Sequence, residues 1–216
     1  MGCCCSCIKK VGGGGKFSKI ELSAKSSNDK VLQISRAMSA PTLDIEDDGK
    51  KVSGNGLGLA GVSIEQDAAY WEWHITIQGK KYDDNDSSTM NDVKFGVSTK
   101  KDRSFYRNLD EQDDVSPATD GTALMKSITD GLRDGDVVGV AVQQSDLPMI
   151  QFLVNGKPYH ELAINRFRGT VYPSIQLPPL SPESRITAEL VFEEEDFQEE
   201  SPHARFGPVI VARGII

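Results

Sequence analysis

Cysteine is absent from the sequence beyond Cys7, so the body of the chain can form no internal disulfide bond and no zinc site built on cysteine. This usage predicts a reducing, intracellular compartment. Histidine is scarce as well, since the chain contains only His74, His160 and His203. These three are far apart in the sequence and form no pattern typical of a catalytic triad or a histidine metal site.

Long apolar runs are also missing. No segment approaches the roughly 18 apolar residues of a membrane-spanning helix. No apolar stretch follows Lys9 and Lys10, as it would in a secretory signal peptide. The length suits one domain and a tail, because a domain of roughly 150–200 residues can bury a self-sufficient core. We therefore expect a cytoplasmic protein with a single domain.

The net charge of −8 is distributed unevenly along the chain. Residues 1–40 contain seven basic and two acidic residues, which gives +5, so the remaining 176 residues carry −13. An acidic body argues against nucleic acid as the main partner, and we predict none. The basic start of the chain needs an explanation of its own.

The first residues, MGCCCS, fit the N-myristoylation pattern M-G-x-x-x-[ST], in which Gly2 becomes the acceptor once Met1 is removed. One myristoyl chain binds membranes only marginally, so a second signal is needed. Lysines that follow the motif supply attraction to an anionic leaflet. Cysteines next to Gly2 are candidates for S-palmitoylation. The predicted lipidation sites are Gly2, Cys3, Cys4, Cys5 and Cys7.

Other interpretations of this start remain open. A metal or redox cluster is disfavoured, because the four cysteines lie too close together for zinc-ligand spacing and lack a structured setting. An unmodified tail is the stronger alternative. Four glycines at residues 12–15 predict a flexible tether. They do not form a phosphate-binding loop, which would need glycine in place of Lys10 and Ser or Thr in place of Phe17. We assign residues 1–29 to a flexible, acylated tail.

The rest of the sequence alternates short β-rich runs with turn signals. Residues 70–77 alternate large apolar with polar side chains and are the clearest strand. Asn155-Gly156 is a strong hairpin signal. The only predicted helical turns lie at residues 123–129. This pattern favours an antiparallel two-sheet β-sandwich. Further strands are expected near residues 31–34, 51–53, 93–99, 137–143, 150–154, 171–177 and 186–192.

Five short motifs occur in an order that resembles the SPRY domain family. From the N-terminal side they are Tyr70-Trp71-Glu72, Phe95-Gly96-Val97, Gly135-Asp136-Val137-Val138-Gly139, Asn155-Gly156 and Val171-Tyr172-Pro173. Each motif is weak alone, but together they are specific, and the resemblance covers about residues 30–196. The resemblance implies an all-β, concanavalin A-like jelly-roll that binds a protein or peptide through loops at one end. It implies no catalytic activity and no cofactor, and it leaves residues 197–216 as a C-terminal extension.

A basic, aromatic loop is the predicted partner site. Tyrosine and arginine are enriched at interface hot spots, and the loop that follows residues 95–99 contains both. We expect Tyr106 and Arg107 to contact the partner, with Arg166 and Arg168 as neighbours. The alternative is that the loop aromatics only pack on the core. Five other aromatic residues are predicted to be core: Trp71, Trp73, Phe95, Phe152 and Tyr172.

Three other motifs carry no predicted function. Residues 56–61 match G-x-G-x-x-G, but a strand follows where a dinucleotide site needs a helix, so glycines at corners between strands explain them better. The acidic run after Tyr82 lacks the glycine and glutamate of an EF-hand, so no metal site is expected. The acidic residues at 193–200 either form a docking face or are simply solvated. A carbohydrate-binding or enzymatic domain of the same architecture, and a soluble unacylated scaffold, remain alternative functions.

Overall fold

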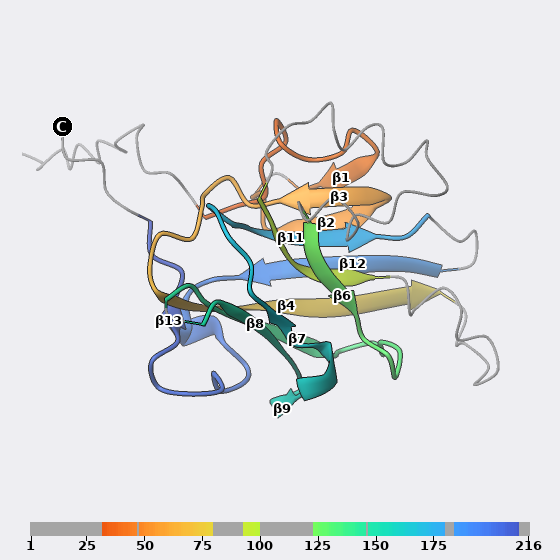
Figure 1. Ribbon diagram of the computed structural model, residues 1–216. Helices are drawn as coiled ribbons and strands as arrows, with labels where there is room; N and C mark the ends of the chain where they lie inside the picture. The colour runs from red at the N-terminus through yellow and green to blue at the C-terminus, as the bar shows by residue number, and fades with distance from the viewer. Residues whose placement is uncertain are drawn as a thin grey trace, which may run out of the picture.

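The computed structural model describes residues 32–46, 48–79, 93–99, 123–145, 147–179 and 184–211. These residues form two antiparallel sheets that pack into a sandwich (Figure 1). In the larger sheet the strand order is β1-β2-β12-β4-β7-β8-β10, with β13 added to β4 and β9 to β8. In the smaller sheet the order is β3-β11-β5-β6. The predicted all-β, two-sheet architecture is confirmed.

Within the described ranges the strands are short apart from β4. The larger sheet contains β1 (Leu43–Ile45), β2 (Lys51–Gly54), β4 (Ala68–Gly79), β7 (Val137–Gln143), β8 (Met149–Val154), β9 (Lys157–Pro158), β10 (Ile164–Asn165), β12 (Ser184–Val191) and β13 (Gly207–Pro208). The smaller sheet contains β3 (Gly56–Leu59), β5 (Lys94–Ser98), β6 (Ala123–Ser127) and β11 (Tyr172–Leu177). Two 3-10 turns, η2 (His160–Leu162) and η3 (Glu194–Asp196), complete the described elements, and none of the described helices is long and apolar enough to cross a bilayer.

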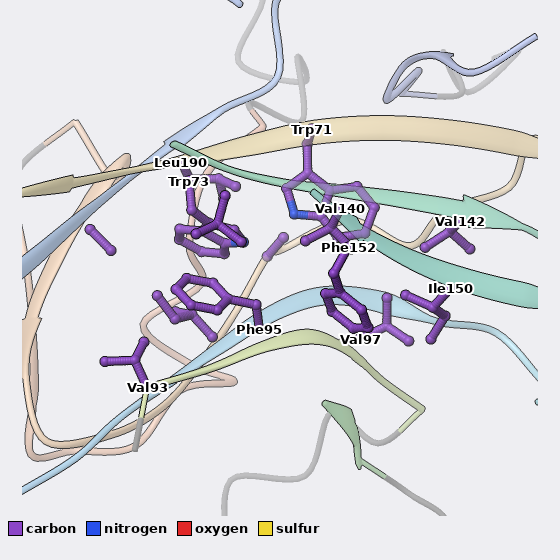
Figure 2. Close-up of a cluster of buried hydrophobic side chains, with 14 of the residues drawn as sticks. Trp71, Trp73, Val93, Phe95, Val97, Val140, Val142, Ile150, Phe152 and Leu190 are labelled. Atoms are coloured by element: carbon purple, nitrogen blue, oxygen red, sulfur yellow. The ribbon is translucent and has the colours of Figure 1, made fainter. Parts of the chain in front are cut away.

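Strand β4 supplies the centre of the core because its side chains alternate between the two faces of the sheet. Trp71 and Trp73 point inward, are fully buried, and face Phe95 of β5 across the sandwich (Figure 2). Phe152 of β8 packs in the same cluster. Full burial of one phenylalanine side chain contributes about 1.5–3 kcal/mol to folding. These four aromatic residues are core residues, as predicted, and so is Tyr172 of β11, which lies in a smaller apolar cluster.

The predicted hairpin at Asn155-Gly156 is confirmed. It joins β8 to β9, and the backbone φ angles of 48° and 72° place both residues in the left-handed region that a type I′ turn requires. The Asn155 side chain also fixes the turn to the neighbouring strand. Its Nδ2 donates to Asp136 Oδ1 at 2.9 Å, and its Oδ1 accepts from the backbone N–H of Val137 at 2.9 Å.

Three details of the predicted secondary structure were wrong. Residues 123–129 do not form a helical turn, because Ala123–Ser127 pairs with β5 over its whole length as strand β6. The expected strand at residues 31–34 is reduced to one bridge between Ile34 and Ala60. Of the glycines predicted to lie at corners, Gly58 lies inside the buried strand β3, whereas Gly56, with a φ of 112°, does lie where the chain passes from β2 to β3. At Gly58 a Cβ atom would lie 2.9 Å from Leu43 Cδ2, so close packing explains this glycine.

The segment that follows β12 packs on the outer face of the larger sheet. Its last strand, β13, pairs in parallel with Ala69 and Tyr70 of β4, beyond the point where β12 ends (Figure 1). Phe206 and Phe197 of this segment form a third apolar cluster with Tyr70, and the rings of Tyr70 and Phe197 meet edge-to-face at 5.1 Å. We call residues 192–211 the C-terminal strap.

Candidate functional site

Three loops meet at one end of the sandwich and border a cavity that is open to solvent. They are the β3–β4, β7–β8 and β10–β11 loops, and they converge because Ala68 opposes Gln143 in the larger sheet while Ile64 forms a bridge with Val171. The cavity has a volume of about 780 Å³. We call it the loop-end cavity. Its lining residues are 63–67, Gln144, Ser145, Gly169 and Thr170.

Gln144 ties two of these loops together. Its side-chain Nε2 donates to the backbone carbonyls of Ile64 at 2.9 Å and Gln66 at 2.8 Å. Its backbone N–H donates to the carbonyl of Asp67 at 2.7 Å. The carboxylate of Asp67 in turn accepts from the backbone N–H of Ser145 at 2.7 Å. These bonds hold the wall of the cavity in one conformation before any ligand is present.

Gln66 ties the C-terminal strap to the same wall. Its Nε2 donates to the carbonyls of Ala68 at 3.0 Å and Pro208 at 2.8 Å, and its Oε1 accepts from the backbone N–H of Ile210 at 2.7 Å. A second contact lies nearby, where Arg205 of the strap donates to Gln143 Oε1. The strap is therefore part of this end of the molecule.

Two large apolar side chains are strongly exposed within the described residues, and both lie at this end. Leu147 is 74% exposed, and Ile210 is 62% exposed. Neither residue lines the cavity, but Leu147 follows the lining residue Ser145 by two positions, and the backbone N–H of Ile210 donates to the lining residue Gln66. Exposed apolar side chains beside a preformed cavity are typical of an interaction site.

Charged side chains of both signs surround the loop-end cavity. Glu65 and Asp67 line it and are exposed. Arg166 and Arg168 are exposed on the β10–β11 loop, just before the lining residue Gly169. Arg166 also connects the β10–β11 loop to the β7–β8 loop. Its backbone N–H donates to the carbonyl of Pro148, the residue after Leu147, at 2.8 Å.

A buried carboxylate fixes the strap further along β4. Glu72 is fully buried, and its two oxygens accept hydrogen bonds from the backbone N–H groups of Gln198 and Glu199, each at 2.9 Å. Tyr70 Oη donates to it at 3.1 Å and His74 Nε2 at 2.7 Å. Burial alone would raise the pKa of Glu72, but these four donors lower it below its usual value.

The carboxylate of Glu72 also fixes the hydrogen-bonding roles of His74 and Tyr70. His74 faces away from Trp73 and Ile75, as the alternation predicts. Since His74 Nε2 donates to Glu72, Nδ1 is left to accept from Gln198 Nε2 at 3.3 Å. Burial, and then the charge of Glu72, raise the pKa of Tyr70 far above its usual range, so its hydroxyl stays protonated and remains a donor.

Only part of the predicted site falls on described residues. Arg166 and Arg168 lie on a loop that borders the loop-end cavity. Tyr106 and Arg107 lie outside the described residues, and so do the lipidation sites, Gly2, Cys3, Cys4, Cys5 and Cys7. Ser98, the last residue of β5, pairs with Tyr172, the first residue of β11. The chain therefore leaves β5 at the end of the sandwich that carries the loop-end cavity. The partner role of all four loop residues stays a prediction.

The residues that build the cavity wall were not predicted from the sequence. Gln66 and Gln144 act through hydrogen bonds to residues as far as 144 positions away, and no local pattern announces such contacts. Leu147 does have a local signal, because it is a lone apolar side chain between Asp146 and Pro148, in a loop that joins two buried strands. No group of three or more His, Cys, Asp or Glu side chains in the described part of the chain could hold a metal ion.

No protein-family model matches the sequence, and no curated protein matches it. Solved structures do match. A structure of stonustoxin is 12% identical with a TM-score of 0.46, covering 74% of this chain and 27% of that one. The SPRY domain of human HERC1 is 16% identical with a TM-score of 0.44, covering 73% and 96%. The TRIM65 PSpry domain is 12% identical with a TM-score of 0.43, covering 75% and 92%.

Each of these three similarities has a TM-score below 0.5 and an identity of 16% or less. The chain spans about a quarter of the stonustoxin chain that it matches. Any statement about activity or partners therefore has to come from the residues of this chain.

Proposed function

We propose that this protein is an interaction module without catalytic activity, which binds a protein or peptide through the loop-end cavity and its rim. The observation that carries the proposal is that Leu147 and Ile210, the two strongly exposed large apolar side chains among the described residues, lie on segments that adjoin the lining residues Ser145 and Gln66 of one cavity. Binding residues concentrate on loops that a rigid scaffold holds in place. The hydrogen bonds of Gln66 and Gln144 supply that rigidity.

The proposed module is tethered to the cytoplasmic face of a membrane by acylation of Gly2 and the adjoining cysteines. The support for this part is in the sequence, where a myristoylation pattern, four neighbouring cysteines and a basic segment follow one another.

A more specific likeness belongs to the same proposal. Among SPRY proteins the sequence resembles SPRY domain-containing protein 7, which also has a cysteine-rich start, a glycine-containing stretch like residues 54–60, the run Arg168-Gly169-Thr170-Val171-Tyr172-Pro173 and an apolar C-terminal extension. We propose these two proteins as relatives. The likeness adds no partner and no catalytic residue.

Recovery of partners from cells tests the proposed binding site. Full-length protein fused to a proximity-labelling enzyme is compared with two double variants, Arg166→Ala/Arg168→Ala and Tyr106→Ala/Arg107→Ala. We expect labelling of specific proteins to fall sharply in both variants, while the melting temperature changes by only a few degrees, the scale of about 1 kcal/mol. The control is Glu195→Gln, an exposed position on η3. Labelling that stays unchanged in both variants would remove these loops from the interface.

A further inference from the structure

The C-terminal strap is attached to the larger sheet at two places that lie far apart along it. At the first attachment, Glu72 accepts hydrogen bonds from two successive backbone N–H groups, beginning with that of Gln198, each at 2.9 Å. At the second attachment, the side chain of Gln66 donates to the carbonyl of Pro208 at 2.8 Å and accepts from the N–H of Ile210 at 2.7 Å. Each of these bonds uses a backbone group of the strap, so each is lost when the strap leaves the sheet.

Tyr70 contacts the strap at both attachments. Its hydroxyl donates to Glu72 at 3.1 Å, and its ring meets that of Phe197 edge-to-face at 5.1 Å. It also shares an apolar cluster with Phe206, and its backbone pairs with Pro208 of β13. Because Tyr70 is fully buried in close-packed surroundings, it cannot lose one of these neighbours without loosening its contact with the others. A change at one attachment is therefore felt at the other.

The strap between the two attachments has few contacts of its own. None of the described strands and helices falls within residues 198–206. In this stretch Ser201 Oγ donates to the carbonyl of His203 at 3.2 Å, which is a contact within the strap, and Arg205 donates to Gln143 Oε1 on the sheet. The middle of the strap thus depends on its two ends, and loss of both attachments frees the whole segment together.

Gln66 connects the strap to the wall of the loop-end cavity. The residue lines the cavity, and its backbone carbonyl accepts from Gln144 Nε2 at 2.8 Å. Its side chain holds the backbone of Ile210, whose own side chain is 62% exposed. One residue therefore belongs to the cavity wall and also fixes the end of the strap.

We propose that the strap attaches and detaches as one unit, and that its attachment is coupled to binding at the loop-end cavity. The attached strap holds Ile210 beside the cavity and keeps the side chain of Gln66 in place. Detachment removes Ile210 from the site and uncovers the apolar cluster around Tyr70. Coupling between two sites is reciprocal, so a bound partner also stabilises the attached strap. The part of this inference that concerns binding rests on the proposed function.

Hydrogen exchange of single backbone amides in the full-length chain tests the coupling. Glu72→Gln weakens the first attachment, and Gln66→Ala removes the second. We expect each variant to accelerate exchange at the opposite attachment, which is Ile210 for Glu72→Gln and Gln198 for Gln66→Ala. The acceleration should be about tenfold or more, equal to a loss of about 1.4 kcal/mol in the free energy of local opening. Exchange that changes only at the substituted attachment would overturn the inference.

Three controls distinguish release of the strap from general loss of stability. Phe206→Ala leaves both hydrogen-bonded attachments intact but removes a ring from the cluster with Tyr70, so it should accelerate exchange at both ends of the strap. Gln176→Ala, on β11 of the smaller sheet, is matched to Gln66→Ala and should change neither end. The amide of Val140 in the buried strand β7 is the internal reference. If Val140 exchanged as much faster as the strap did, global unfolding would explain the data and the inference would be wrong.

Partner recovery separates the inference from the proposed function. Glu72 does not line the cavity, so Glu72→Gln reaches the site only through the strap. Proximity labelling of specific partners by full-length Glu72→Gln should fall severalfold from the wild-type level. If wild type and Glu72→Gln labelled the same partners equally, although the strap of the variant was detached, the inference would fail and the interaction module would stand. A wild-type protein that labels no partner overturns the proposed function, and the exchange rates then still decide whether the strap moves as one unit.

Discussion

The carboxylate of Glu72 accepts a hydrogen bond from the backbone N–H of Glu199 at 2.9 Å, although the two residues are 127 positions apart. The second oxygen of Glu72 holds Gln198 in the same way. One buried side chain thus fixes the C-terminal strap to the middle of β4. The strap continues to Ile210 at the rim of the loop-end cavity, so Glu72 contributes to the position of a residue in the proposed binding surface.

Replacing Glu72 by glutamine tests this attachment. Glutamine keeps one acceptor oxygen but presents an NH₂ group where the second strap N–H needs an acceptor, so a buried donor loses its partner. We expect Glu72→Gln to lower the free energy of unfolding by about 1–3 kcal/mol. The melting temperature should fall by about 2–4 °C for each kcal/mol in a protein of this size. Glu195→Gln is the matched control, and a change of no more than about 0.5 kcal/mol is expected there. Equal effects of the two substitutions would contradict the attachment.

The stabilisation by Glu72 should depend on pH. Because its pKa is lower in the folded protein than in the unfolded chain, ionised Glu72 stabilises the fold at any pH above the unfolded value of about 4.3. This contribution is lost as the pH falls from that value through the lowered folded value. Chemical unfolding of wild type and Glu72→Gln at several pH values measures the effect. Their difference should be largest near neutral pH and shrink below about pH 4. A difference that grew with acidity would show the wrong sign.

The larger elements of the fold could be predicted from the sequence, because their signals are local. The alternation around Trp71 and Trp73 reflects which side of β4 is buried, and Asn155-Gly156 encodes its own turn. Strand β6 had no such signal. Residues 123–127 form a strand because they pair with β5. Strand β5 ends at Ser98, so it is not a neighbour of these residues in the sequence. Non-local pairing therefore overrode a weak local preference.

The site was harder to predict than the fold for the same physical reason. Glu72 alternates with two tryptophans, so the pattern correctly placed it on the opposite face of β4. That face is covered by the strap, whose residues lie more than 120 positions later. The alternation of apolar and polar residues in β4 could not show that the C-terminal strap covers this face. Gln66 is a similar case, since its role depends on Pro208 and Ile210. Arg166 and Arg168 were predicted only as neighbours of the loop that contains Tyr106 and Arg107, and that loop was chosen because its basic charge contrasts with an acidic body, which is a compositional signal.

Gly139 should not tolerate alanine. A Cβ atom at this position of β7 would lie 2.5 Å from the hydroxyl oxygen of Tyr70, on the face of the sheet that the strap covers. Tyr70 is held by Glu72 and Phe197 and cannot move away freely. We expect Gly139→Ala to destabilise the protein by about 1–3 kcal/mol through overpacking. Gly207→Ala is the control, because a Cβ atom added there would have no heavy atom within 4 Å and no left-handed φ is required. Thermal unfolding of both variants measures the difference, and a Gly139→Ala protein as stable as the control would disprove the close packing.

Substitutions in the tail test the proposed membrane tether. Gly2→Ala removes the acceptor for myristate, and without it we expect the protein to move largely to the soluble fraction of cells. Replacing Cys3, Cys4, Cys5 and Cys7 by serine should leave weak, reversible binding, because one myristoyl chain partitions with a constant of only about 10⁴ M⁻¹. Gly12→Ala is the matched control, since it changes a glycine of the tether outside the motif. Fractionation with metabolic labelling by myristate and palmitate analogues distinguishes the two lipids. If Gly2→Ala stayed bound to membranes and carried neither lipid analogue, acylation would not be the anchor. The basic residues at 9–19 would then have to account for the binding through attraction to the anionic leaflet alone.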